Sequence, residues 1–301
     1  MNLARTFLIL LLLAMGTAAR RSWAEDIPPN TKVFRDVEYV AGGGHSRSLD
    51  LFVPEAKPGV KIPVVVWIHG GAWRGGNKDG NQARWLLKDG FATASINYRL
   101  SPEARFPAQI EDCKAAIRFL RSHAQEYGID GEHIGVWGSS AGAHLAVMLG
   151  TTGGVRGLDG NNDSPNISSR VQAVCDFFGP SDLLSASSQA GPDSQVNHDD
   201  PSAPEAQLIG GPVQQTADKA LAASPVNYIT PDDPPFLIVH GEHDPLVPIG
   251  QSWELYGTLQ KAGVKVTMHV VKGGGHGDHF DSKEIVPLVR EFFEQALTEK
   301  K

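Results

Sequence analysis

The sequence predicts an α/β fold with a mostly parallel central sheet, helices on both faces and a small lid insertion. Strand-like and helix-like segments alternate along the chain, as expected where helical crossovers join parallel strands. The run Ile62 to Ile68 is almost wholly apolar, which is typical of a strand buried on both faces. Residues 181–223 lack this periodicity and are rich in Ser, Gln, Asp, Pro and Gly, which indicates an insertion rather than a second domain.

Each element has its own local signal. Glycines 42–44 predict a turn between the first two strands, and Ile110, Cys113, Ile117 and Leu120 share one face of a long helix. The last helix is amphipathic. In chain order, the expected strands are 33–40, 48–53, 62–68, 92–98, 134–137, 171–178, 236–240 and 264–271. The expected helices are 82–88, 107–127, one starting at 141, 253–262 and 285–297.

Length and composition suit one globular domain, predicted to span 25–301. The 301 residues are 41% hydrophobic and 20% charged, which supports a sizeable core. The formal net charge is −7 and no long basic run occurs, so no nucleic-acid partner is expected.

The first 24 residues predict a signal peptide. Arg5 precedes an apolar stretch, 7–15, that is too short to span a bilayer, so no stable membrane span is expected. We therefore expect export to the periplasm or the medium. The alternative is that the segment is not cleaved and anchors the chain by its N-terminus. The candidate cleavage sites follow Ala18, Ala19 and Ala24.

Two cysteines are present, Cys113 and Cys175, each among apolar neighbours. An exported protein permits a disulfide between them. Because one lies in a predicted helix and the other in a predicted strand, buried free thiols are the favoured interpretation.

Gly138-Ser139-Ser140-Ala141-Gly142 is the first motif that points to chemistry. It lies between a predicted strand and a predicted helix, where Gly-x-Ser-x-Gly holds its serine on a sharp turn with the hydroxyl exposed. The glycines are needed because side chains would crowd that turn. Ser140 is therefore the candidate nucleophile, although such a string also arises as plain turn chemistry.

A serine nucleophile needs a base, and the base needs an acid that orients it. Asp244 follows the strand 236–240 and is the candidate acid, with Glu242 as the alternative. His276 follows the glycines 273–275 after the last strand and is the candidate base, with His279 as the alternative. This chain order, serine, acid and then histidine, each after its own strand, is one of the orders in which a Ser-Asp-His triad occurs.

The loop His69-Gly70-Gly71-Ala72-Trp73 follows another strand and supplies backbone N–H groups for an oxyanion hole. The expected donors are Gly71, Ala72 and, beside the nucleophile, Ala141. Trp73 and Ser139 are tentative substrate-binding residues. Structural hydrogen-bonding roles are expected for His69, His144 and His240.

These motifs resemble the α/β-hydrolase superfamily in its esterase and lipase branch, which includes hormone-sensitive-lipase-like carboxylesterases. The segments 69–78 (HGGAWRGGNK) and 177–182 (FFGPSD) are more similar to feruloyl-esterase-like and acetylxylan-esterase-like proteins. The resemblance covers the chain from about Asp36 onward. It implies Ser140, Asp244 and His276 as the triad, with no cofactor or metal. Ala72 departs from the family pattern, because a third glycine usually stands there.

We expect the large N-terminal helical cap of the family to be missing or reduced in this chain, because the mature chain begins close to its first strand, and therefore expect an open site that admits bulky esters. The predicted function is a secreted serine carboxylesterase acting on acetyl, feruloyl or short-chain acyl esters, either small molecules or groups linked to a polysaccharide. The alternatives are a serine peptidase of the prolyl-oligopeptidase type and a non-catalytic binding module. A peptidase of that type usually carries a propeller domain, for which 301 residues leave no room.

Overall fold

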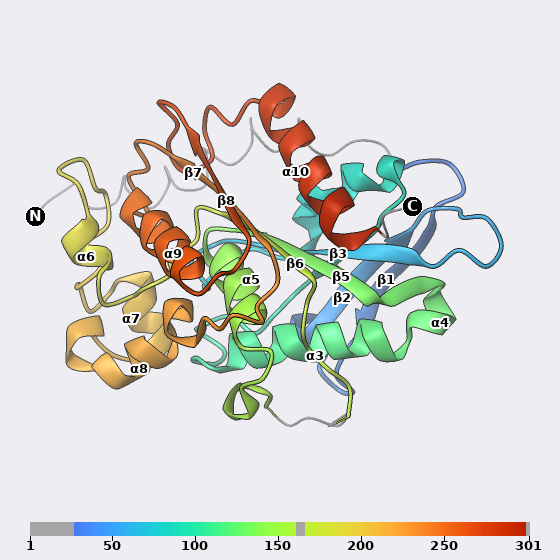
Figure 1. Cartoon of the computed structure of the whole chain (residues 1–301). Helices are drawn as coiled ribbons and strands as arrows, with labels where there is room; N and C mark the ends of the chain where they lie inside the picture. The colour runs from blue at the N-terminus through green and yellow to red at the C-terminus, as the bar shows by residue number, and fades with distance from the viewer. Residues whose placement is uncertain (1–26, 161–165, 299–301) are drawn as a thin grey trace, which may run out of the picture.

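The computed structural model describes residues 27–160 and 166–298, so the predicted signal peptide and its cleavage candidates lie outside the described residues. Within these ranges, eight strands form one sheet in the order β1-β2-β4-β3-β5-β6-β7-β8 (Figure 1). β2 pairs antiparallel with β1 and β4, and the pairs from β4 to β8 are parallel. The strands are β1 (Lys32–Glu38), β2 (Ser48–Val53), β3 (Ile62–Ile68), β4 (Ala92–Ile96), β5 (Ile129–Ser139), β6 (Ala173–Phe177), β7 (Phe236–Gly241) and β8 (Val266–Val271).

Helices cover both faces of this sheet (Figure 1). Side chains of β3 alternate between the two cores, because successive residues of a strand point to opposite faces. Val64 and Val66 join one core, while Val65 and Trp67 join the other. The first core is covered by α3 (Ala108–Ser122), α5 (Ala141–Thr151) and α9 (Ile249–Lys261), and the second by η4 (Gln82–Asp89) and α10 (Ser282–Leu297). The predicted α/β architecture is thereby confirmed.

Two predicted helices differ from the observed ones. Residues 82–89 form the 3-10 helix η4, which ends where the N–H of the left-handed Gly90 reaches the carbonyls of Leu86 and Leu87. The predicted helix 107–127 divides at His123 into α3 and the short α4 (Ala124–Tyr127). The His123 ring stacks on Phe119 at 4.2 Å, so a side-chain contact accompanies this break.

The segment 181–223 contains short helices that its weak periodicity did not predict. They are α6 (Ala186–Gln189), α7 (Pro204–Ile209), η6 (Val213–Gln215) and α8 (Ala217–Ala222). Leu183, Leu208 and Ala220 are buried in the same core as α3 and α5. The insertion therefore packs onto the main domain, and its role as a lid stays a prediction.

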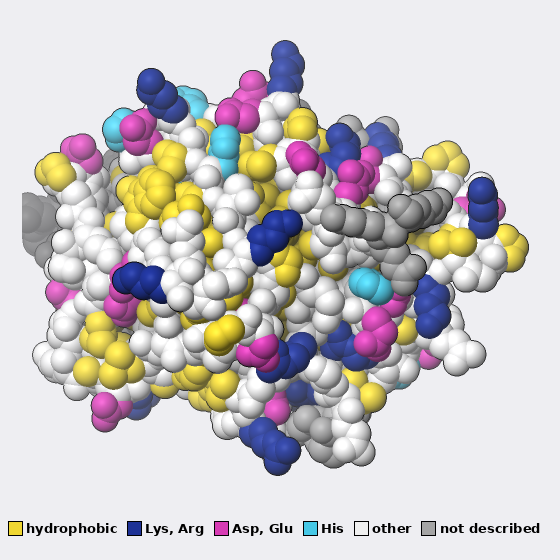
Figure 2. Space-filling model, in the orientation of Figure 1, with side chains coloured by type: hydrophobic (Ala, Val, Ile, Leu, Met, Phe, Trp, Pro, Cys, Tyr) yellow, Lys and Arg dark blue, Asp and Glu magenta, His cyan; other side chains and the backbone are white. Residues whose placement is uncertain are grey.

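The remaining short 3-10 helices are η2 (His45–Arg47), η3 (Lys78–Gly80), η5 (Arg156–Leu158) and η7 (Pro225–Tyr228). Cys113 and Cys175 are buried and free, as the sequence favoured. Among the described residues, no helix is long and apolar enough to cross a bilayer. Figure 2 shows acidic and basic side chains interspersed over one face of the molecule.

Candidate active site

Ser140 lies at the tight turn between β5 and α5. Its backbone angles, φ 54° and ψ −123°, are strained for a residue with a side chain. The Ser140 N–H donates to the Phe177 carbonyl at 2.8 Å, which ties the turn to β6. A Cβ on Gly138 would lie 2.2 Å from the Gly142 carbonyl oxygen, and one on Gly142 would lie 2.1 Å from that of Ile68. Both glycines are thus required by close backbone packing, as the motif indicated.

The loop after β3 lies directly against this turn. A Cβ on Gly70 would be 2.7 Å from the Ser139 carbonyl oxygen and 3.4 Å from Cβ of Ser140. Gly71, Ala72 and Trp73 all have positive φ, of 113°, 55° and 54°. Ala72 thus occupies a backbone conformation that suits the glycine it replaces, so its methyl group adds strain at the loop.

Among the described residues, the backbone N–H groups of Gly71, Ala72 and Ala141 have no protein acceptor. Ala141 begins α5, where the first N–H groups of a helix have no partner within the helix. The partial positive charge of a helix N-terminus also favours an anion at this point. These three groups remain the predicted oxyanion donors.

The acid and base candidates meet at the same edge of the sheet. His276 Nδ1 lies 2.7 Å from Asp244 Oδ2, and the backbone N–H groups of Leu246 and Val247 donate to Asp244 Oδ1. The Asp244 side chain is fully buried, whereas that of His276 is 18% exposed. Because Asp244 accepts the Nδ1 proton, Nε2 of His276 is left free to accept another.

Asp244 is held as a carboxylate by these partners. Burial alone acts to raise its pKa, but hydrogen bonds from His240 and His276 more than offset burial and hold the pKa well below its usual range. The alternatives lie elsewhere: Glu242 accepts from the Gly273 N–H at 2.9 Å, and Nδ1 of the exposed His279 lies 3.0 Å from the Gly273 carbonyl oxygen. The geometry thus joins Asp244 to His276 rather than to His279.

Two other histidines near the turn are buried and uncharged. Burial lowers the pKa of His69 and of His144 to about 4 in each case. His69 stacks on Tyr98, and His144 Nε2 lies 2.7 Å from the Ala223 carbonyl oxygen. Trp73 is 2% exposed, and its indole N–H donates to His144 Nδ1 at 3.2 Å. Substrate binding by Trp73 and Ser139 stays a prediction.

Phe178 and His240, which the sequence analysis did not assign to the site, contact the Asp–His pair, and Asp176 interacts with His240. The Phe178 ring lies 4.5 Å from that of His276, and His240 Nε2 lies 3.2 Å from Asp244 Oδ2. Asp176 on β6 is fully buried, and burial raises its pKa to about 7. The only sequence feature that could have indicated Asp176 is an acidic residue within an apolar strand. Phe178 was marked only by its place in the segment 177–182.

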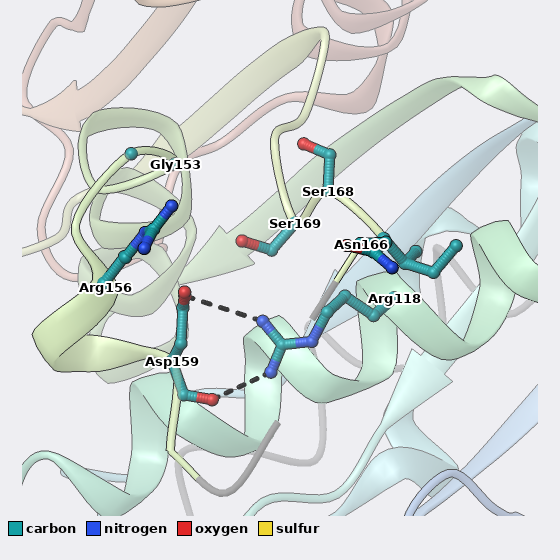
Figure 3. Close-up of a pocket in the computed structure, with 9 residues that line it drawn as sticks. Arg118, Gly153, Arg156, Asp159, Asn166, Ser168 and Ser169 are labelled. Atoms are coloured by element: carbon teal, nitrogen blue, oxygen red, sulfur yellow. Dashed lines mark hydrogen bonds and ion pairs between the residues drawn. The ribbon is translucent and has the colours of Figure 1, made fainter. Parts of the chain in front are cut away.

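A separate cavity of about 380 Å³ lies beyond the C-terminal end of α5, at the opposite end from Ser140 (Figure 3). Figure 3 shows Arg118 and Asp159 facing each other there, with Ser168 and Ser169 nearby. The Arg118 guanidinium donates to the Asp159 carbonyl at 2.9 Å, and Lys114 Nζ lies 3.0 Å from Asp159 Oδ1. Opposite charges pair here, which suits a structural role.

The strand order, with the serine turn after β5, is the α/β-hydrolase arrangement, and solved esterases share it. A truncated form of a carbohydrate esterase from gut microbiota has a TM-score of 0.82 and 36% identity, covering 92% of this chain and 99% of that one. A bifunctional GH43-CE protein from Bacteroides eggerthii has a TM-score of 0.80 and 34% identity, covering 88% of this chain and 35% of that one.

The BD-FAE family model matches residues 49–259, so the chain belongs to the BD-FAE family within the esterase branch. Esterase LipQ of Mycobacterium tuberculosis is 31% identical over 271 residues, which are 86% of this chain and 62% of LipQ. The chain thus spans less than two thirds of the length of this curated relative.

Proposed function

We propose that the chain hydrolyses carboxylic esters, with Ser140 as nucleophile, His276 as general base and acid, and Asp244 as the group that orients His276. The observation that carries this proposal is the 2.7 Å contact between His276 Nδ1 and Asp244 Oδ2, at the sheet edge where the strained Ser140 turn lies. Membership of the BD-FAE family and the similarity to esterase LipQ support it.

In the proposed reaction, His276 Nε2 takes the Ser140 hydroxyl proton as Oγ attacks the ester carbonyl carbon. The tetrahedral intermediate collapses, the C–O bond to the alcohol breaks, and His276 returns the proton to the leaving alcohol. Water then attacks the acyl-enzyme with the same base, releasing the acid and restoring Ser140. The ionised Asp244 stabilises the imidazolium that forms in both steps.

The developing oxyanion would accept hydrogen bonds from the N–H groups of Ala141 and of Gly71 or Ala72. Donors fixed in advance are effective because they need no rearrangement as the charge develops. Loss of one such donor costs about 3 kcal/mol of transition-state stabilisation. The positive φ values of residues 71–73 describe a sharply turned loop, which supports close approach of its backbone to a substrate.

For the substrate, we propose an acetyl, feruloyl or short-chain acyl ester, carried by a small molecule or a polysaccharide. The similarity to a carbohydrate esterase from gut microbiota favours a sugar-linked ester. Residues 1–24 favour export of the mature chain. N-terminal sequencing of the protein recovered outside the cytoplasm tests the export proposal, and an intact Met1 in the cytosol would contradict it.

A panel of p-nitrophenyl acetate, butyrate and octanoate, methyl ferulate and acetylated xylan, with peptide anilides alongside, tests the activity. Ester cleavage that disappears in Ser140→Ala is the expected result. The bases are compared directly: His276→Ala should abolish cleavage, and His279→Ala should leave it nearly intact. Greater loss with His279→Ala, or cleavage of anilides alone, would contradict the proposal.

A further inference from the structure

A second histidine contacts the carboxylate of Asp244 from inside the protein. His240 lies near the end of β7, and its side chain is fully buried. Its Nε2 lies 3.2 Å from Asp244 Oδ2 and 3.0 Å from the Val247 carbonyl oxygen. On the other side of the ring, Nδ1 lies 2.7 Å from Oγ of Ser252, a buried residue of α9.

These contacts determine which ring nitrogen carries a proton. A carbonyl oxygen only accepts hydrogen bonds, so the 3.0 Å contact with Val247 requires a proton on Nε2 of His240. That same N–H is shared with Asp244 Oδ2, while Nδ1 is free to accept the Ser252 hydroxyl proton. His240 is therefore oriented as a donor toward Asp244.

Both imidazoles approach the same carboxylate oxygen. Asp244 Oδ2 receives His276 Nδ1 at 2.7 Å and His240 Nε2 at 3.2 Å, while Oδ1 receives the two backbone donors of its own loop. A hydrogen bond to the charged form of an acid stabilises that form. A second donor at Oδ2 therefore lowers the strength with which Asp244 attracts the His276 proton.

We propose that His240 is a positioning residue, which holds Asp244 in place for His276 and limits how strongly Asp244 stabilises the protonated form of His276. This role rests on the proposed function, because it acts through the Asp244–His276 pair. Its consequence is that the acid limb of the kcat/KM profile depends on residue 240. Ser252 supports it by orienting the His240 ring.

Other titratable groups also surround the pair and are still present when His240 is replaced. On β6, the buried Asp176 is close enough for its charge to interact with His240. The remaining groups lie in the loops after β7 and β8, and are Glu242, His243, Asp278 and His279. Because His240 lowers the pKa of Asp176, the variants at 240 are compared in an Asp176→Asn background, where a difference reports on His240 itself.

The test compares His240→Leu, which removes the donor, with His240→Gln, whose side-chain N–H reaches toward the position of Nε2. His240→Leu should move the acid limb of the kcat/KM profile to higher pH by about half a unit. It should also lower kcat about tenfold at unchanged KM. His240→Gln should restore most of both. The exposed His243→Leu is the matched control, and its profile should coincide with the unmodified protein.

A second variant, Ser252→Ala, tests the same role in case His240→Leu folds poorly. Ser252→Ala leaves the His240 ring in place but removes its orienting hydroxyl, so a smaller shift in the same direction is expected. NMR titration of the His276 ring in a Ser140→Ala background measures the same shift in a protein that has no activity. The proposal is wrong, and the role of His240 is structural only, if neither the acid limb of the kcat/KM profile nor the ring titration moves in His240→Leu. If His240→Leu does not fold, the same two measurements on Ser252→Ala decide.

Failure of the proposed function gives a different result. In that case Ser140→Ala or His276→Ala retains activity while His240 is intact. Failure of the His240 proposal alone leaves those variants inactive, with an acid limb that does not respond to residue 240.

Discussion

The two ends of α5 are built for opposite purposes. At the N-terminal end, the N–H of Ala141 has no acceptor within the described residues, and the Ser140 turn before it packs against Gly70. At the C-terminal end, the buried Lys114 Nζ donates to the Thr152 carbonyl at 2.7 Å and to that of Val155 at 3.2 Å.

Every helix leaves N–H groups unpaired at its start and carbonyl groups unpaired at its end. In this protein Lys114 donates to the carbonyl of the C-cap residue Thr152, whereas the N–H of Ala141 is the proposed donor to a transient negative charge. This contrast indicates that the C-terminal end of α5 contributes mainly to stability and the N-terminal end mainly to the proposed reaction. Substitutions at the two ends should therefore divide cleanly between unfolding and turnover.

The largest expected effect comes from the N-terminal end. Ser140→Ala removes the nucleophile and should lower kcat by about four to six orders of magnitude. The free energy of unfolding should change by less than about 1 kcal/mol, because the side chain at the turn is small in both forms. Ester hydrolysis and denaturant unfolding measure the two quantities, and retention of a tenth of the activity would contradict the nucleophile assignment.

The second effect belongs to the C-terminal end. Lys114→Met leaves the Thr152 and Val155 carbonyls without their cation and leaves Asp159 paired with Arg118 alone, and should reduce the free energy of unfolding by about 3 kcal/mol. The kcat of the folded fraction should not change. Arg156→Met, in the exposed part of the same cavity, is the control and should cost less than about 0.5 kcal/mol. Loss of kcat without loss of stability would break the comparison.

The third effect concerns the pH dependence of stability that Asp176 produces near the N-terminal end of α5. Asp176 accepts from the Gly179 N–H at 2.9 Å, and Gly179 packs on the first turn of α5, where its Cβ would lie 2.8 Å from the His144 backbone nitrogen. Burial raises the pKa of Asp176 to about 7, whereas an unfolded aspartate titrates near pH 4. The folded state therefore binds more protons between these values, so this group makes stability fall as pH rises from about 4 to about 7.

Asp176→Asn removes this titration but keeps an acceptor for Gly179. The variant should be more stable than the unmodified protein by about 4 kcal/mol at pH 8 and by about 1.5 kcal/mol at pH 5, and the difference should vanish below about pH 4. Denaturant unfolding at both pH values measures it. A constant difference at pH 5 and pH 8 would show that Asp176 does not titrate in the folded protein.

The smallest effect concerns the oxyanion loop. Ala72 has φ 55°, so Ala72→Gly should relieve strain and raise the free energy of unfolding by up to about 1 kcal/mol. The N–H of residue 72 remains, so kcat should stay within about twofold. Ala146→Gly within α5 is the matched control and should cost about 1 kcal/mol or more. Destabilisation by both substitutions would argue against strain at residue 72.

Much of the fold followed from local patterns in the sequence. The apolar run 62–68 and the helix from Ala141 lie where expected, because strand and helix periodicity reflect which faces of an element are buried. Residues 82–88 were expected to be helical, and the structure has the 3-10 helix η4 over 82–89, which ends at the left-handed Gly90. The short helices of 181–223 were not expected, since their burial depends on the core supplied by α3 and α5.

The sequence by itself determined the positions of Ser140, Asp244 and His276, each after its own strand, and the glycines that let the chain turn there. These features are local, because a tight turn restricts the residues within it. Only the tertiary structure decided that His240 shares an oxygen of Asp244 with His276, and that Lys114 closes the far end of α5. Buried polar groups take their partners from elements distant in the chain, and sequence spacing does not reveal which partners the packing supplies.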